Sequence, residues 1–273
     1  MTGVSLALDG KVALISGGSR GIGAETVRLF SQAGARVAFS YRRARQQAEA
    51  LAAERGGADS RGAQRCVAIA QELSTPADGR ALVQKAVAAM GRLDILVVNH
   101  GIWEAEDAPI AEMAEAQWRR TLAVNLESVF GLVQSAVKQM ERQTGAESRA
   151  RNGEPVGHIV LISSTAGQRG EAYHADYAVT KGALISLTKS LSSELAAKGI
   201  RVNCVAPGWV ATDMSAATLA DAATGPKIAA TIPVGRVASP REIAGPVLFL
   251  CTPLAGFICG EVLNVNGGAV LVG

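Results

Sequence analysis

The sequence has little histidine and cysteine, and neither residue type is arranged for a metal site or a disulfide. Three histidines and four cysteines are spread over 273 residues, with no Cys-x-x-Cys pair. The cysteines, which all stand among apolar residues, are Cys66, Cys204, Cys251 and Cys259. We therefore expect reduced core thiols. The histidines show no ligand spacing, so we expect no metal.

A membrane-spanning run and a strong charge imbalance are also missing. No apolar stretch reaches about 18 residues, the length typical of a spanning helix. Residues 1–9 do not read as a basic region followed by an apolar one. The formal charge is +3, and the densest basic patch, residues 42–45, is short enough for a solvated helix start. We expect a soluble, cytoplasmic protein without nucleic-acid or membrane partners.

Apolar residues and glycine are abundant. The hydrophobic fraction is 48%, and 30 glycines are present, which favours a large core with many turns between strands and helices. We find no repeat and no linker, and the polar residues 144–155 predict an exposed loop. The chain is therefore expected to form a single domain over residues 1–273, a common size for an α/β domain.

Short apolar segments alternate with helical patterns along the chain. Predicted strands cover residues 11–16, 36–40, 65–70, 93–98, 158–162, 200–205 and 261–265, and helical segments run from the glycine cluster to about 34, then over 76–90, 110–142 and 175–197, and around 247–250. This alternation predicts a Rossmann-type, doubly wound α/β domain with a seven-stranded parallel sheet and helices on both faces.

A glycine cluster follows the first predicted strand and opens a helix. Gly17, Gly21 and Gly23 let the backbone turn sharply, and a helix N-terminus offers free N–H groups to a phosphate. The second strand ends in Tyr41 and Arg42, where an acidic residue would select NAD and an arginine accommodates a 2′-phosphate. With Arg20 in the loop, two guanidiniums suit a dianion, and we expect NADP(H).

Tyr177 and Lys181 stand four residues apart near the start of the predicted helix 175–197, with Gly199 placed to cap its end. This spacing puts both side chains on one helix face. A nearby cation favours the phenolate, so we expect Lys181 to lower the pKa of Tyr177 from about 10 and make it a general acid/base.

With these motifs assembled, the chain resembles the short-chain dehydrogenase/reductase family over nearly its full length. The correspondence includes the glycine loop, Asn99–Gly101 after the fourth strand, Asn125, Ser164 thirteen residues before Tyr177, and the stretch 207–212. Residues 232–236 and 260–268 are similar to the 3-oxoacyl-[acyl-carrier-protein] reductase group. The chain departs from the family pattern at Ser16, which replaces Thr, at Val98, which replaces Asn, and at His100, which replaces Ala.

The resemblance implies a carbonyl reductase in which Tyr177 donates a proton, Ser164 holds the carbonyl oxygen, Lys181 binds the nicotinamide ribose and Asn125 supports a water chain. It also implies a homotetramer. Arg142, Arg149 and Arg151 could meet an acidic acyl carrier protein, although a solvated surface is the favoured interpretation of these arginines. Two alternatives stay open: a reductase or dehydrogenase of small ketones, sugars or secondary alcohols, and a non-catalytic dinucleotide sensor.

The predicted catalytic residues are Ser164, Tyr177, Lys181 and Asn125. The predicted cofactor-binding residues are Gly17, Ser19, Arg20, Gly21, Ile22, Gly23, Tyr41, Arg42, Glu72, Leu73, Asn99, Gly101, Tyr177, Lys181, Pro207, Gly208, Val210 and Thr212. Ser164, His174 and Tyr177 are expected to contact the substrate. His100 is expected either to touch the cofactor or to pack beside its turn, and His158 to lie at a surface or edge. Residues 213–230 predict a mobile segment on the substrate side.

Overall fold

A computed structural model describes residues 6–57, 62, 64–143 and 155–272. Seven parallel strands form one sheet in the order β3-β2-β1-β4-β5-β6-β7. The strands are β1 (Val12–Ser16), β2 (Arg36–Tyr41), β3 (Cys66–Ala70), β4 (Ile95–Val98), β5 (Gly157–Ile162), β6 (Ile200–Pro207) and β7 (Val262–Val265). The predicted fold class and all seven predicted strands are confirmed.

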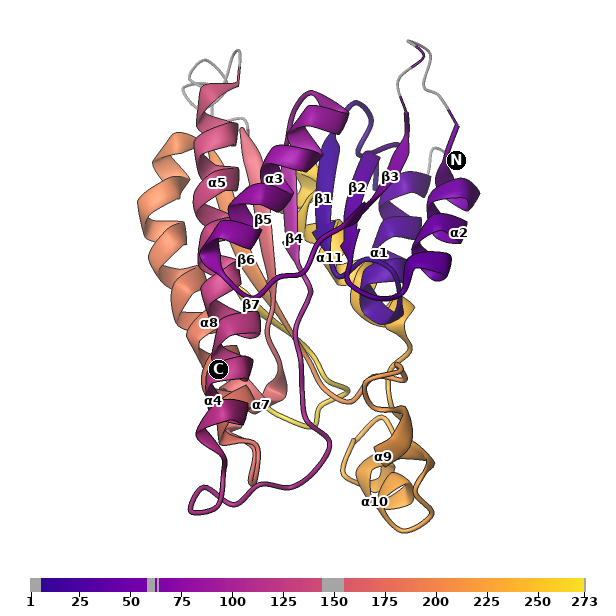
Figure 1. Cartoon of the computed structure of the whole chain (residues 1–273), viewed down its shortest axis with the longest axis vertical. Helices are drawn as coiled ribbons and strands as arrows, with labels where there is room; N and C mark the ends of the chain where they lie inside the picture. Colours follow the sequence, from indigo (N-terminus) through magenta and orange to yellow (C-terminus); the bar gives the residue numbers. More distant parts are fainter. Residues whose placement is uncertain (1–5, 58–61, 63, 144–154, 273) are drawn as a thin grey trace.

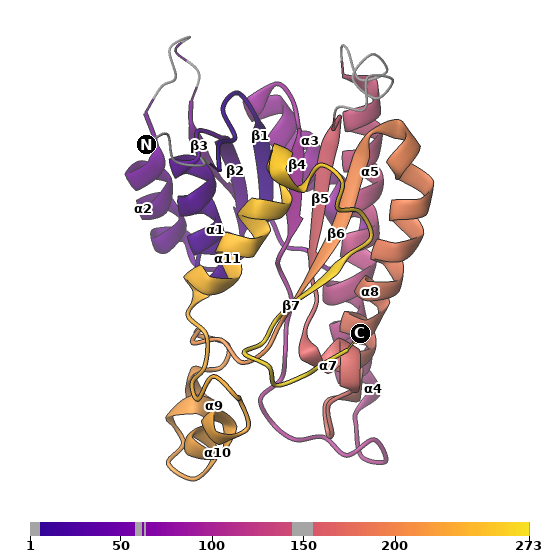
Figure 2. The same cartoon turned by 180° about the vertical axis from the view of Figure 1, so that it is seen from behind.

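Helices cover both faces of the sheet, as Figures 1 and 2 show from opposite sides. One face carries α3 (Pro76–Met90), α5 (Ser128–Arg142) and α8 (Ala175–Leu195), and the other carries α1 (Gly21–Gln32), α2 (Arg45–Arg55) and α11 (Pro240–Leu250). Each face has its own apolar cluster, centred on residues such as Leu132 and Leu184 on one side and Phe30 and Val247 on the other. Because both faces are covered, β1, β4 and β5 are buried along their whole length.

The strand order reverses between β1 and β4. The chain proceeds outward from β1 through β2 to β3, then returns to place β4 on the other side of β1. At such a switch point the loops after neighbouring strands diverge to opposite faces, which leaves a crevice beyond the carboxyl ends of the strands. The glycine loop follows β1 and the Asn99–Gly101 turn follows β4, so both border this crevice.

The helical region predicted over 110–142 is divided. It begins with α4 (Glu115–Leu122), passes through a π-helical turn η1 (Ala123–Glu127) and continues as α5. A π-turn inserts one residue into the hydrogen-bond ladder, which a hydrophobic repeat does not reveal. The helix predicted over 175–197 ends as α8 at Leu195 and a 3₁₀ turn η2 (Ala196–Lys198), and Gly199 caps it with φ of 76°.

His158 is buried, so the predicted surface or edge position is wrong. β5 lies between β4 and β6 in the middle of the sheet, and His158 pairs in register with Ile95 and Arg201. Of the cysteines, Cys66, Cys204 and Cys251 are buried as predicted, whereas Cys259 is half-buried. The loop predicted over 144–155, with Arg149 and Arg151, falls almost wholly outside the described residues.

Two short helices project beyond the carboxyl end of the sheet: α9 (Ala216–Ala220) and α10 (Thr224–Ala230) (Figure 1). Neither has a buried residue. They occupy the segment predicted to be mobile, and its mobility stays a prediction. A further short helix, α7 (Thr165–Arg169), precedes α8. In the part of the chain that the structure describes, no helix is long and apolar enough to cross a membrane.

Candidate active site

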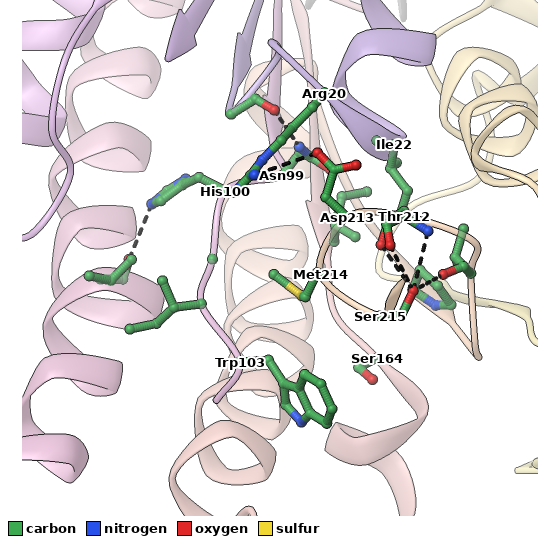
Figure 3. A pocket seen from close by; sticks show the side chains of 18 of the residues that line it. Arg20, Ile22, Asn99, His100, Trp103, Ser164, Thr212, Asp213, Met214 and Ser215 are labelled. Carbon is green, nitrogen blue, oxygen red and sulfur yellow. Dashed lines mark hydrogen bonds and ion pairs between the residues drawn. The ribbon is translucent and has the colours of Figure 1, made fainter. Parts of the chain in front are cut away.

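A cavity of about 680 Å³ opens at the switch point and extends past the ends of β1, β4, β5 and β6. Figure 3 shows Arg20 and Asn99 toward one end, with Trp103 and Ser164 toward the other. The predicted site residues that line it are Gly17, Ser19, Arg20, Gly21, Ile22, Tyr41, Arg42, Leu73, Asn99, Gly101, Ser164, Tyr177, Lys181, Pro207, Gly208, Val210 and Thr212. The fold thus brings together residues spread over almost 200 positions.

The glycine loop has the backbone shape that its sequence predicts. Gly17 and Gly21 adopt positive φ angles of 66° and 55°, which side-chain-bearing residues rarely do. Gly23 does not line the cavity; a Cβ there would overlap Gly17 O and Asn99 Nδ2. The third glycine therefore lets α1 pack closely against the loop.

The start of α1 suits an anionic ligand. Within the described chain, no side chain caps the helix at Arg20, so the first N–H groups of α1 keep their hydrogen-bonding capacity and the positive end of the helix dipole. A loop with this backbone at a cavity edge fits the pyrophosphate of a dinucleotide. The donor set and the cavity, which runs on to Tyr177, therefore fit such a cofactor.

Both arginines at the predicted adenosine end lie near carboxylates. Arg42 Nη1 is 3.7 Å from Glu72 Oε1, and Arg20 Nη1 is 3.5 Å from Asp213 Oδ2. All four side chains are largely exposed, and exposed pairs at these distances contribute little to stability, about 0–1 kcal/mol. The guanidiniums are therefore easily redirected to a phosphate. Glu72 does not itself line the cavity.

Ser164, Tyr177 and Lys181 come from two adjoining segments. Ser164 follows β5 and caps α7, its Oγ accepting from Ala166 N at 3.1 Å. Tyr177 and Lys181 lie in the first two turns of α8 and both line the cavity. The Lys181 Nζ donates to Ile162 O at 2.8 Å, at the end of β5. The predicted shared face of the helix is thus observed.

The expected lowering of the Tyr177 pKa is wrong for this arrangement. Burial raises the pKa of Tyr177, the charge of Glu171 raises it further, and only the hydrogen bond with Ser164 opposes them. Lys181 is buried too, and burial lowers its pKa to about 8. Desolvation of both groups outweighs the attraction that the i, i+4 spacing predicts.

Asn125 lies in the π-helical turn η1 and is buried. Its side chain does not line the cavity but is hydrogen-bonded to the turn after β4. Oδ1 accepts from Ile102 N at 2.8 Å, and Nδ2 donates to Ile102 O at 2.9 Å. The amide also donates to Thr180 Oγ1 at 3.2 Å, one residue before Lys181. Asn125 therefore ties η1 both to the turn and to α8.

The substrate side holds residues that the sequence did not single out. Trp103 and Trp209 line the cavity with ring centroids 6.0 Å apart and planes at 90°, and Glu171 lines it too. They stand on irregular loops, where no periodicity marks them. His174 is buried and packs against Trp103 at 5.0 Å, without lining the cavity. His174 thus supports Trp103 from behind the cavity wall, and its contact with the substrate stays a prediction.

In the residues that the structure describes, no group of three or more His, Cys, Asp or Glu side chains could hold a metal ion. Besides the carboxylates of Glu171 and Asp213, the site presents hydroxyl, amine, guanidinium and aromatic groups around a glycine loop. Such groups bind and orient an anionic cofactor and exchange a proton with a substrate oxygen.

Comparison with known proteins agrees with this geometry. The family described as enoyl-(acyl carrier protein) reductase matches residues 17–270. The 3-oxoacyl-[acyl-carrier-protein] reductase of Vibrio cholerae is 35% identical over 268 residues, covering 97% of this chain and 99% of that protein.

Two solved structures from Brucella melitensis have the same fold. A short-chain dehydrogenase/reductase described as a glucose/ribitol dehydrogenase superposes with a TM-score of 0.84 at 32% identity, covering 98% of this chain and all of that one. A 3-ketoacyl-(acyl-carrier-protein) reductase complexed with NADH gives 0.83 at 30% identity, covering 97% and 100%. The chain belongs to the short-chain dehydrogenase/reductase family of oxidoreductases.

Proposed function

We propose that this protein is an NADPH-dependent reductase that converts the 3-oxo group of an acyl thioester to an alcohol. The observation that carries the proposal is the single cavity that joins the glycine loop to the hydroxyls of Ser164 and Tyr177 and the amine of Lys181. A dinucleotide anchored on the loop would extend toward these groups. The similarity to 3-oxoacyl-[acyl-carrier-protein] reductases supports the substrate class.

The bound dinucleotide supplies the hydride. Ser164 donates a hydrogen bond to the carbonyl oxygen and stabilises the charge that develops there, an effect of about 2.7–4 kcal/mol when a donor is preorganised. Tyr177 delivers its hydroxyl proton to the same oxygen. A high Tyr177 pKa keeps this proton in place until the oxygen becomes basic, which suits a general acid in reduction.

Lys181 assists at two places. Its Nζ donates to Ile162 O, which holds the amine at the end of β5 and in reach of a ribose hydroxyl. Its charge also favours the phenolate that Tyr177 becomes after proton transfer. Asn125 anchors the turn whose Gly101 lies close to Lys181 Nζ. The family resemblance assigns it a further role, the support of re-protonation of the site through water.

We expect NADPH rather than NADH because of Arg20 and Arg42. Both line the cavity, and their carboxylate partners are distant and exposed, so a 2′-phosphate would attract both guanidiniums. Within the described residues, the carboxylate nearest to Arg42 is Glu72 on the next strand's loop, not a residue at the end of β2. A carboxylate at that end would select the ribose hydroxyl instead.

A second candidate is a reductase or dehydrogenase of a small ketone or sugar. The similar structure described as a glucose/ribitol dehydrogenase favours it, as do Trp103 and Trp209, whose indole rings suit a compact ring-shaped substrate.

Acyl carrier protein as a partner and a homotetrameric assembly remain predictions. Support for self-association comes from exposed apolar side chains, including Val179 on α8 and Phe257 and Leu271 near β7. Static light scattering of the purified protein tests the tetramer, and a monomer at micromolar concentration would contradict it.

The proposed function is tested by following NADPH absorbance with acetoacetyl-CoA, crotonyl-CoA, cyclic ketones and ketoses. Turnover of acetoacetyl-CoA well above that of the others is the expected result. Turnover of crotonyl-CoA alone would indicate reduction of a carbon–carbon double bond and overturn the proposal. Preference for the ring ketones or ketoses would establish the second candidate. Cofactor binding without turnover of any substrate would favour a dinucleotide sensor.

A further inference from the structure

Two departures from the family pattern, Ser16 and His100, contact each other. Ser16 Oγ lies 2.7 Å from His100 Nδ1. The other ring nitrogen, Nε2, lies 2.8 Å from Ser128 Oγ and 3.2 Å from Val124 O. One imidazole therefore spans from the last residue of β1, through the turn after β4, to the π-helical turn η1 and the start of α5.

The hydrogen-bond donors and acceptors around the ring select one tautomer of His100. Ser16 Oγ already accepts from Asn99 N at 3.0 Å and His100 N at 3.3 Å, which occupies both of its lone pairs. Its own proton is therefore donated, and Nδ1 at 2.7 Å is a closer acceptor than Val97 O at 3.4 Å. Ser128 Oγ donates to Val124 O at 2.8 Å and is left as an acceptor for Nε2–H. The neutral Nε2–H tautomer satisfies every group. Burial and the charge of Lys181 lower the His100 pKa to about 3, so the ring stays neutral.

The turn after β4 is held from both sides. His100 bonds to Val124 and Ser128, while Asn125, between them in the chain, bonds to both backbone groups of Ile102. These contacts fix η1 against the turn. A shift of His100 would therefore displace Asn125, which also bonds to Thr180, the residue before Lys181.

The turn that carries His100 borders the glycine loop. Asn99 Nδ2 donates to Gly17 O at 3.0 Å, and a Cβ added to Gly17 would stand 3.0 Å from His100 Cα. The loop that would bind the cofactor phosphates and the turn that carries His100 are thus in direct contact. His100 also lines the cavity.

We propose that His100 is a positioning residue whose two ring nitrogens couple the glycine loop to the π-helical turn that carries Asn125. It acts through Ser16 on the cofactor side and through Ser128 and Val124 on the catalytic side. The expected effect on kcat rests on the proposed reduction, whereas the hydrogen bonds of His100 and its tautomer do not depend on it.

Three variants separate the two bonds. His100→Ala, which restores the residue usual in the family, removes both. His100→Asn places an amide oxygen near the position of Nδ1 and keeps only the bond to Ser16, and His100→Gln places an amide nitrogen near Nε2 and keeps only the bond to Ser128. His158→Ala is the matched control, since His158 is a second buried, neutral histidine, located at the amino end of β5.

We expect His100→Ala to lower kcat about tenfold or more, because a displacement of about 1 Å costs up to about 10²-fold. In the same variant the NADPH Kd should rise, and the substrate KM should change less than kcat. The kcat values of the asparagine and glutamine variants should lie between those of the wild type and His100→Ala. His158→Ala should lower the thermal midpoint and leave kcat per folded molecule unchanged. In the double variant of Ser16→Ala and His100→Ala, the loss of activation free energy should be smaller than the sum of the two single losses, because the Ser16–His100 bond is broken in both.

A readout independent of turnover is the ¹⁵N spectrum of ring-labelled protein. An Nε2–H signal for His100, unchanged between pH 5 and 9, is expected. An Nδ1–H tautomer, or a titration near pH 6.5, would overturn the proposal, as would a folded His100→Ala variant with wild-type kcat and NADPH Kd. If the wild type reduces no carbonyl compound, the proposed function fails, and the tautomer and cofactor affinity still decide the role of His100.

Discussion

Lys181 Nζ is bonded to Ile162 O at 2.8 Å and lies 5.5 Å from the centre of the Tyr177 ring. The ammonium is thus fixed by the last carbonyl of β5 rather than by the phenol four residues before it. Burial disfavours its charge and lowers its pKa to about 8. This places the ionisation of Lys181 close to physiological pH, whereas an exposed lysine ionises near 10.4.

We therefore predict that Lys181 titrates near pH 8 in the cofactor-free protein. Because the folded-state pKa lies below the unfolded value of 10.5, the unfolded chain binds more protons between pH 8 and 10.5. Stability from this group thus rises with pH in that window. NMR of ¹³Cε-labelled lysine measures the titration, and Lys181→Met assigns the signal. A midpoint above pH 10 would contradict the predicted burial effect.

Replacing Tyr177 by Phe should lower kcat for carbonyl reduction by about 10²–10⁴-fold, the usual contribution of a general acid. Cofactor affinity should change little, since the ring remains. Tyr173→Phe is the control: Tyr173 stands in the same segment, is 53% exposed and should retain full activity. Near-normal reduction by the Tyr177→Phe variant would show that Tyr177 is not the proton donor.

Arg42→Asp should reverse the cofactor preference. The substitution removes a donor for the 2′-phosphate and supplies an acceptor for a ribose hydroxyl, and a charged hydrogen bond contributes about 1.5–3 kcal/mol. We expect the NADPH/NADH ratio of kcat/KM to fall at least about tenfold. Arg45→Asp makes the same charge change three residues away, at an exposed arginine paired with Glu49. An equal NADPH/NADH ratio of kcat/KM in the two variants would show that the change in net charge, and not a contact of Arg42 with the phosphate, causes the effect.

The parts of the fold that could be predicted are those with a regular repeat. Buried strands and the long helices carry apolar residues at fixed spacing, and the glycine loop follows from backbone geometry that only glycine adopts easily. The π-turn at Asn125 could not be predicted, because one inserted residue leaves the apolar pattern almost intact.

The site residues that belong to a sequence motif could be predicted, whereas those on irregular loops could not. Trp103 and Glu171 reach the cavity from irregular segments with no periodic signal. The Tyr177 pKa went in the opposite direction to the prediction because spacing gives proximity but not burial. His158 was misplaced since its position at the start of a strand does not reveal that β5 is central and covered on both faces.

His158 should make the protein sensitive to acid. Burial lowers its pKa from 6.5 to about 4, with the charges of Lys11 and Arg201 acting in the same direction and Asp94 opposing. Among the residues that the structure describes, its Nδ1 has no hydrogen-bond partner, so a proton on that nitrogen would be left unsatisfied in the interior. A backbone hydrogen bond with Leu250 and the charge of Asp94 offset the effect of burial only in part. The fold therefore favours the neutral ring over the protonated one.

The unfolded chain therefore binds a proton between pH 6.5 and 4 that the folded chain excludes, and stability falls as pH falls through this window. A pKa difference of one unit corresponds to about 1.4 kcal/mol, so His158 accounts for a loss of up to about 3 kcal/mol by pH 4. Urea unfolding of wild type and His158→Asn at several pH values measures this. The variant should show a shallower decrease below pH 6.5, whatever its stability at neutral pH, because asparagine does not titrate. Parallel curves would mean that His158 takes up its proton in the folded state at little cost, and that the acid sensitivity arises elsewhere.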